Sequence, residues 1–376
     1  MENIFITKIH IEKVRHLNNI DINLSDTQRK HLIFTGKNGS GKTSLLEAMR
    51  DSVAYEQRGI NPDGIRLMRA AGDKKPDIKI SYSHSIENFT NFIFVHISAR
   101  RSEFILPKAI ESVQIKDKTN IIQNTSKDFL IYILGLDYQL YGAKSDKNKK
   151  QEAVLEKWFD NFLKALRNIY NCQEMELQRD TKNLTFKIIM PGREPFALNE
   201  ISDGYTAFLN IIIELLMRLE NVDMGVDYDK SAIVMIDEIE THLHVELQKR
   251  VLPFLTQMFP NVQFIVATHS PFVITSLENA VVYDLEKNER LEKPSFYAYD
   301  TVVESFLDTS MYSNEINKYF SRYKELCYKE RTPEENEEFL RAKAELEIRT
   351  IPSTELYIAF QDLEKRRKAV KNDTSI

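Results

Sequence analysis

The sequence predicts an α/β fold built on a parallel β-sheet, and three observations support that class. A short apolar strand, HLIFT at 31–35, runs into a cluster of glycines that is followed by a helical pattern from Thr43. From Ser202 to about residue 286, apolar strands alternate with helices, which is typical of parallel sheets. The composition, with 42% apolar and 28% charged residues, is that of a globular protein with a sizeable core.

Composition also excludes several classes of protein. The net charge of −5 excludes a global basic field for nucleic acid or anionic membranes. Two distant cysteines, Cys172 and Cys327, argue against a disulfide framework or a cysteine zinc site and suit a reducing cytosol. The N-terminus has charges where a signal peptide would be apolar, and the run FLNIIIELLMRL is too short to span a bilayer. We therefore expect a cytoplasmic protein with no membrane partner.

The elements of the first half follow from apolar periodicity. Two alternating runs within 4–24 predict paired strands, and they precede the strand–glycine–helix unit at 31–57. The segments DIKISYSH and NFTNFIFVHIS also indicate strands. The stretch 104–150 is mixed and ends in a lysine cluster, after which 152–170 predicts an amphipathic helix. The segments MELQRD and LTFKIIM then predict a hairpin around Lys182 and Asn183.

The second half defines the expected domain organisation. We assign residues 1–58 and 181–300 to one core, and 59–180 to an insertion whose helical lid or arm lies at about 104–170. Residues 301–376 are helical and charge-rich, and we expect them to form an extension that contacts a partner or a second copy. No sustained heptad pattern supports a long coiled-coil arm.

The glycine cluster carries the first functional motif. Residues 36–43, GKNGSGKT, match the pattern G-x-x-x-x-G-K-[ST] in full. Glycines let successive backbone N–H groups point inward around phosphate oxygens, and the helix N-terminus behind them favours negative charge. Lys42 would then reach the β- and γ-phosphates, and the Thr43 hydroxyl would coordinate Mg²⁺. The alternative is an ordinary glycine turn, which the strand–loop–helix context disfavours.

A second motif follows the buried strand AIVMI. Asp237 and Glu238 come directly after it, and open α/β sheets bind ligands at the carboxyl ends of their strands. One carboxylate there can hold Mg²⁺, and its neighbour can accept a proton from the attacking water. A solvated acidic turn is the other interpretation, which the upstream phosphate loop disfavours.

Two shorter motifs leave alternatives open. Ser202 suits a helix N-cap and Gly204 permits a close backbone approach, so ISDGY is compatible with a capped core helix. It is equally compatible with a second anion site, facing the γ-phosphate of another protomer. His269 follows the strand VQFIVAT; a lone histidine there is more often structural, but it could hydrogen-bond the γ-phosphate or the attacking water.

Taken in order, GKNGSGKT, ISDGY, MIDEIETHLH and VATHSP resemble the motifs of ABC-type ATPases of the SMC and RecF group. Within that group the sequence is similar to compact bacterial ATPases of OLD-type and Septu-type antiphage defence. The likeness covers roughly 1–58 and 195–286. It implies a P-loop NTPase of the ABC-ATPase head type, with a mixed α/β insertion and a helical C-terminal extension. It also implies ATP and Mg²⁺ as cofactors.

By position, the resemblance implies a role for each motif residue. Asp237 joins Thr43 on Mg²⁺, while Glu238 is the catalytic base and His269 the switch histidine. Ser202, Asp203 and Gly204 would form a signature that acts in trans. They would cap ATP bound to a second subunit, so that ATP closes a head-to-tail dimer or a larger oligomer. The implied nucleotide-binding residues are Gly36, Lys37, Asn38, Gly39, Ser40, Gly41, Lys42, Thr43 and Ser44, with Arg15, Arg100 and Arg101 as further basic candidates.

The sequence departs from the transporter pattern at three positions. Asp203 and Tyr205 replace the first glycine and the last residue of the common LSGGQ signature, and His244 stands where transporters usually have aspartate. These departures favour the SMC and OLD side of the group. His242, His244 and Glu246 could also be interpreted as metal ligands, but their place in the dimer-contact loop after the base explains them better.

The leading functional hypothesis is an ATP-hydrolysing switch that controls a separate effector, a nuclease or toxin, in antiphage defence. A DNA-repair ATPase of the RecF or SMC type, which binds DNA directly, is the first alternative, and a transporter-coupled ATPase is the second. Nucleic-acid binding would have to use a local patch, either the lysines at 144–150 or the basic run at 365–371.

Overall fold

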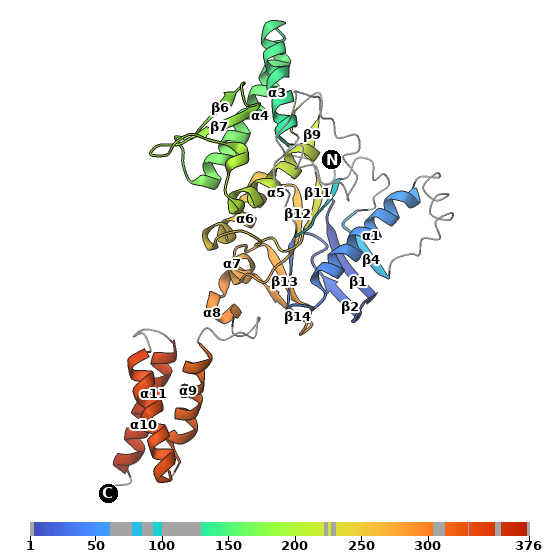
Figure 1. Ribbon diagram of the computed structural model, residues 1–376. Coiled ribbons are helices and arrows are strands. Elements are labelled where there is room, and N and C mark those ends of the chain that lie inside the picture. The colour runs from blue at the N-terminus through green and yellow to red at the C-terminus, as the bar shows by residue number, and fades with distance from the viewer. Residues whose placement is uncertain are drawn as a thin grey trace. The chain divides into compact units, whose positions relative to one another are not determined.

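The structure is a computed structural model that describes residues 4–60, 77–84, 93–99, 129–221, 225–226, 231–303, 313–329, 331–349 and 355–373. The chain forms two compact units, Met1–Val302 and Val303–Ile376 (Figure 1). The first unit contains the motifs singled out in the sequence.

A six-stranded sheet forms the centre of the first unit, in the order β14-β13-β3-β12-β11-β5. Its strands are β3 (His31–Thr35), β5 (Ile93–Ile97), β11 (Ala232–Ile236), β12 (Val262–Ala267), β13 (Ala280–Asp284) and β14 (Glu289–Glu292). All neighbours are parallel except β14, which pairs antiparallel with β13 at one edge. Every residue of β3, β11 and β12 is buried, so both faces of the sheet are covered, as parallel sheets require.

One face of this sheet is covered by helix α1 (Lys42–Ile60) and a three-stranded antiparallel sheet of order β2-β1-β4. These strands are β1 (Ile6–Val14), β2 (Leu17–Asn23) and β4 (Ile78–Tyr82). Apolar side chains of α1 at helical spacing share one core cluster with Ile9, Ile22 and Phe34. Burial of this helix face therefore fixes the phosphate-loop motif against the sheet.

Helix α5 (Asp203–Leu219) is almost entirely buried and contacts β5 and helix α6 (Val245–Met258). Within it, the fully buried Arg218 donates from Nε to Glu214 Oε1 at 2.7 Å. The short helix α7 (Pro271–Ile274) packs on α6, and its first turn is capped by Ser270, whose Oγ accepts from Val273 N at 3.2 Å. The two-stranded β9 (Glu220–Asn221) and β10 (Gly225–Val226), the 3₁₀ turn η4 (Pro294–Phe296) and α8 (Tyr299–Thr301) complete this part.

A lobe of two helices and a small sheet precedes α5. Helix α3 (Phe129–Ser145) packs on α4 (Lys149–Tyr170), where the buried Trp158 lies 5.4 Å from the Phe162 ring. The sheet joins β6 (Glu176–Asp180), β7 (Thr185–Ile189) and β8 (Phe196–Ala197), and the turn η3 (Leu198–Glu200) leads into α5. The β6–β7 pairing confirms the hairpin predicted around Lys182.

The second unit consists, in its described residues, of helices α9 (Asn314–Cys327), α10 (Pro333–Arg349) and α11 (Glu355–Asp373). They pack around Tyr323, Phe339 and Phe360. Inside this core, the buried Glu364 carboxylate accepts hydrogen bonds from Tyr323, Lys343 and Arg367.

The predicted fold class is confirmed, including the parallel sheet and the helical C-terminal part. Strands β4 and β5 lie inside 59–180, the range that the sequence assigns to an insertion, yet they pair with β1 and β11. The proposed domain boundaries therefore stay a prediction. Among the described residues, no helix combines the length and the apolarity needed to cross a bilayer.

Candidate nucleotide-binding site

Three adjacent strands bring the sequence motifs to one edge of the central sheet. β12 lies between β3 and β11, with Ala267 beside Phe34 and Val266 beside Ile236. Because these strands are parallel, the segments that follow their carboxyl ends meet at the same edge. The Ile239 N–H donates to Ala267 O at 3.3 Å, which ties the segment after β11 to the end of β12.

The loop after β3 has a backbone that only glycine adopts easily. Gly36, Gly39 and Gly41 have φ angles of 129°, 87° and 97°, which L side chains rarely adopt. A Cβ at Gly36 would also lie 2.8 Å from Ser40 Oγ, and one at Gly41 would lie 3.2 Å from Leu17 Cδ1. The loop is thus a cradle of backbone, with no room for side chains at two of its three glycines.

Lys42 places its ammonium inside this cradle. Its Nζ donates to Gly36 O at 2.8 Å and to Lys37 O at 3.1 Å, and the residue is buried. Burial lowers the pKa of Lys42, while the nearby carboxylates Asp237, Glu240, Glu238 and Asp284 act in the opposite direction. A buried cation beside a glycine cradle at a helix start fits the phosphates of a nucleotide.

The β1–β2 turn forms one wall of the cradle. His16 Nε2 lies 3.2 Å from Ser40 O, and its Cε1 would lie 3.3 Å from a Cβ at Gly41. Arg15, the preceding residue, is exposed with a left-handed φ of 53°. The structure thus brings the turn that contains Arg15 to the phosphate loop, with His16 making the contact.

The turn after β13 forms the opposite wall. Lys37 donates from Nζ to Glu286 Oε1 at 3.1 Å, and its backbone N–H lies 3.4 Å from Glu286 Oε2. Asp284 Oδ1 accepts the backbone N–H groups of Glu286 and Lys287 at 2.8 and 3.0 Å, which fixes the turn.

Asp237 and Glu238 stand at the end of β11, in different environments. Asp237 is buried, and its N–H donates to Ile97 O at 2.9 Å. Glu238 is half-buried with a φ of 43°, and its Oε2 accepts from Thr241 Oγ1 at 3.2 Å. The Asp237 carboxylate and the Thr43 hydroxyl offer oxygen ligands that suit Mg²⁺, which is usually held by one or two protein groups and by substrate phosphates.

Metal sites made wholly of protein ligands are a separate question. Within the described ranges, no cluster of three His, Cys, Asp or Glu side chains is arranged to hold a metal ion. His242, His244 and Glu246 are all exposed on the loop after Glu238 and at the start of α6.

The segment after β12 is bound to the loop that follows Glu238. The His269 N–H donates to Glu240 Oε1 at 2.6 Å. Next to it, Ser270 Oγ donates to Gln248 Oε1 at 2.6 Å, and Gln248 Nε2 donates to Leu243 O at 2.7 Å. Burial and the positive charge of Lys42 lower the pKa of His269, while the carboxylates of Glu240 and Glu238 act in the opposite direction.

The start of α5 contacts the same loop. Ser202 and Asp203 are exposed, whereas Gly204 is buried against the loop. A Cβ at Gly204 would lie 2.8 Å from His242 O, so the close approach that the sequence suggested for this glycine is present. The Tyr205 ring stacks on Tyr170, the last residue of α4, at 4.0 Å and 10°.

The remaining candidates lie elsewhere. Arg100 and Arg101 fall outside the described residues. In the lysine cluster, Lys144 pairs with Glu156 and Lys149 with Glu152, each at 2.8 Å. Direct nucleic-acid binding through such patches stays a prediction.

Sequence reasoning gave no role at this site to His16, Gln248, Asp284 or Glu286, and it placed Glu240 only in the dimer-contact loop after the base. His16 reaches the loop only through the hairpin that carries it, and no local pattern marks it. Glu240 lies within the motif MIDEIETHLH, where its position two residues after Glu238 was the available indication.

Comparison with known proteins agrees with this geometry. Residues 129–275 match a family model described as "AAA domain, putative AbiEii toxin, Type IV TA system". The chain is 26% identical over 352 residues to Septu protein PtuA of Bacillus mycoides, covering 85% of this chain and 47% of the relative. It is 30% identical over 149 residues to the "Retron Ec83 probable ATPase" of Escherichia coli, covering 39% of this chain and 26% of the relative. The chain thus spans about half or less of these relatives' lengths.

Among solved structures, an SMC head bound to the C-terminal winged-helix domain of ScpA matches with a TM-score of 0.42 and 14% identity, covering 78% of this chain and all of that chain. The named relatives agree with the sequence motifs and with the way in which these motifs meet at one edge of the sheet. The predicted resemblance to antiphage-defence ATPases is therefore confirmed: the chain is similar to a Septu protein, to a probable retron ATPase and, at 38% identity over 60 residues, to the RecF protein of Rickettsia typhi.

Proposed function

We propose that the chain binds ATP with Mg²⁺ and hydrolyses it. The observation that carries this proposal is the position of Lys42, a buried cation inside a glycine cradle with Asp237 and Glu238 in electrostatic range. Phosphoryl transfer to water needs positioned cations around the phosphates and an acceptor for the proton of the attacking water. This sheet edge offers both.

Each motif residue has a role in this proposal. The loop from Gly36 to Ser44 holds the phosphates through backbone N–H groups and Lys42. Thr43 and Asp237 hold Mg²⁺, which when bound supplies neutralisation of the phosphate charge. Glu238 accepts the proton of water, and His269 hydrogen-bonds the γ-phosphate or that water.

We further propose that ATP closes a head-to-tail dimer. Ser202 and Asp203 stand exposed at the start of α5, next to the loop that contains His242. A second protomer can therefore reach this helix start, whose N–H groups suit a γ-phosphate. Gly204 lets the start of α5 lie directly against the loop after Glu238. A movement of the dimer surface at this helix start would therefore also move the loop next to the catalytic base.

A role in antiphage defence, through control of a separate effector such as a nuclease or toxin, is supported by the relatives. Their printed names place them in the Septu and retron systems. We propose that ATP-dependent dimerisation is the step that such an effector senses.

The test of the ATP site is a single substitution. Lys42→Ala should abolish ATP binding in isothermal titration calorimetry, because it removes the cation at the cradle. Lys182→Ala, a substitution in the exposed β6–β7 turn, is the matched control and should bind ATP like the wild type. Wild-type affinity in Lys42→Ala would refute the assignment of this loop.

A further inference from the structure

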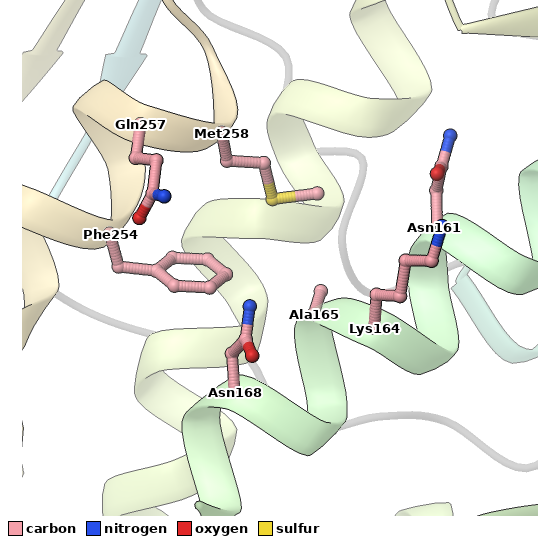
Figure 2. Close-up of a pocket in the computed structure, with 7 residues that line it drawn as sticks. All are labelled: Asn161, Lys164, Ala165, Asn168, Phe254, Gln257 and Met258. Carbon is pink, nitrogen blue, oxygen red and sulfur yellow. The ribbon is translucent and has the colours of Figure 1, made fainter. Parts of the chain in front are cut away.

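A groove between α4 and α6 lies away from the phosphate loop. It has a volume of about 290 Å³, large enough for one substituted ring system. Figure 2 shows Phe254 and Met258 projecting from α6 toward α4, where Ala165 and Asn168 face them. The lining residues are Asn161, Lys164, Ala165, Asn168, Phe254, Gln257 and Met258.

The spacing of these residues explains why a groove exists here. On each helix the second and third lining residues follow the first by three and four positions, and on α4 a fourth follows by seven, so each set lies on a single helix face. The α4 face is built around Ala165, whose small side chain leaves space opposite the larger groups of α6. The two helices are held together by Arg250, which donates from Nη2 to Asn168 O and so ties α6 to the last turns of α4.

The walls of the groove suit a flat aromatic ring. The Phe254 ring is held edge-on against Phe208 at 5.4 Å and 82°, which fixes its orientation. Met258 adds a polarisable thioether, which packs favourably on aromatic rings. Asn161, Asn168 and Gln257 each carry a carboxamide that both donates and accepts hydrogen bonds. These groups together match an aromatic ring whose edge carries both hydrogen-bond donors and hydrogen-bond acceptors.

The charge of the groove selects an anion. Lys164 is exposed and lines the groove, whereas none of the seven lining residues is acidic. An ammonium at the rim can pair with a phosphate while the ring enters between the helices.

We propose that this groove binds a nucleoside monophosphate, with the base between α4 and α6 and the phosphate at Lys164. This site is separate from the one around Lys42. Both helices also lead to that site: α6 begins at Val245, directly after the loop that follows Glu238, and α4 ends at Tyr170, which stacks on Tyr205. If the proposed ATPase function holds, an occupant of the groove is therefore placed to alter ATP turnover.

The test measures binding in the full chain carrying Lys42→Ala, so that the phosphate loop does not compete. The probes are AMP, GMP, CMP and UMP in calorimetric titrations, with the corresponding nucleoside and ribose 5-phosphate as the ring and the anion alone. At least one monophosphate should bind at one site per chain, and its two halves should each bind at least about tenfold more weakly. No binding of any of the four at millimolar concentration would overturn the proposal.

Two substitutions locate the binding. Lys164→Glu, at an exposed position, should weaken monophosphate binding about tenfold or more by reversing the rim charge. Ala165→Phe should abolish binding by filling the groove, and Lys150→Glu at the other end of α4 is the charge-matched control. Equal affinity in Lys164→Glu and Lys150→Glu would overturn the proposal. Because no step of this test requires ATP hydrolysis, a failure here leaves the ATPase proposal standing.

Discussion

Glu238 combines a functional position with a left-handed backbone conformation. Its φ of 43° is one that glutamate rarely adopts, and such conformations cost roughly 1–3 kcal/mol and concentrate at active sites. The side chain is meanwhile held by Thr241. Local backbone preference does not explain this residue, whereas a functional role for its carboxylate at the end of β11 would.

Replacing Glu238 separates binding from chemistry. Glu238→Gln keeps the size and the hydrogen bond from Thr241 but removes the proton acceptor, so ATP should bind while turnover falls at least about 100-fold. ATP-bound dimer should then accumulate in gel filtration. Glu278→Gln, an exposed change just before β13 and outside the site, is the control and should retain turnover. Turnover at the wild-type rate in Glu238→Gln would mean that another group is the base.

Glu240 offers a second test at this scale. Its Oε1 holds the His269 N–H, so Glu240→Ala should release the segment of His269 and lower kcat for ATP about tenfold or more. Glu240→Gln preserves an acceptor and should retain more of the activity, while calorimetry should show similar ATP affinity for both. Equal kcat for Glu240→Ala and the wild type would show that this bond does not position the histidine.

Individual residues of the site show which features could be predicted from the sequence. Lys42, Asp237 and His269 were predicted because each lies at a fixed place after an apolar strand, and parallel strands bring such places together. His16 was not predicted, because its contact with Ser40 depends on how the β1–β2 turn packs on a loop 24 residues away. Contacts made by tertiary packing alone leave no periodic pattern.

At the scale of elements, Gly204 joins α5 to the loop after Glu238. Gly204→Ala would bring a Cβ within 2.8 Å of His242 O, and the forced shift should destabilise the fold by about 1–3 kcal/mol. ATP turnover should fall as the loop moves. Thermal unfolding and steady-state assays measure the two effects.

Gly142 supplies the matched control for this substitution. It lies in α3, and a Cβ there would meet nothing within 4 Å. Gly142→Ala should therefore stabilise the helix by about 0.5–1 kcal/mol and leave turnover unchanged. The two alanine substitutions should change the free energy of unfolding in opposite directions. A change in the same direction would refute the argument from close approach at Gly204.

The segments that form strands were easier to predict than the strands with which they pair. The segments 78–82 and 93–97 were predicted as strands, but β4 belongs to the small sheet and β5 to the central one. Alternation or apolarity defines a strand, whereas its neighbour is chosen by long-range pairing. Helix α3 lies inside the range 104–170 predicted as a helical lid or arm, but its bounds were not predicted, because its apolar residues are spread around the helix and no amphipathic period is visible.

At the scale of the whole molecule, the second unit depends on one buried carboxylate. Burial raises the pKa of Glu364, but hydrogen bonds from Arg367, Tyr323 and Lys343 outweigh it and hold the pKa at about 2, against an ordinary 4.5. Since this pKa is lowered in the folded state, its contribution to stability is complete above about pH 4.5 and is lost as the pH falls toward 2.

Acid should therefore open this unit selectively. Hydrogen exchange of full-length protein should show the α11 peptides losing protection between pH 4.5 and 2, after correction for intrinsic exchange rates. Glu364→Gln should lower protection at neutral pH and flatten this dependence. Glu334→Gln, an exposed change in the first turn of α10, should leave it unaltered. An unchanged acid profile in Glu364→Gln would exclude this carboxylate as the cause.

The burial of Trp158 has a practical consequence. It is the single tryptophan of the chain, it is 4% exposed, and it lies against the aromatic rings of α3 and α4. Its emission is therefore expected to be blue-shifted in the native protein and to move to the red when the lobe opens. The wild-type chain thus carries its own optical probe, which reports on the first unit alone. Trp158 lies in α4, and the last residue of this helix, Tyr170, stacks on Tyr205 at the start of α5. The label-free readout therefore comes from a helix that contacts the proposed dimer surface.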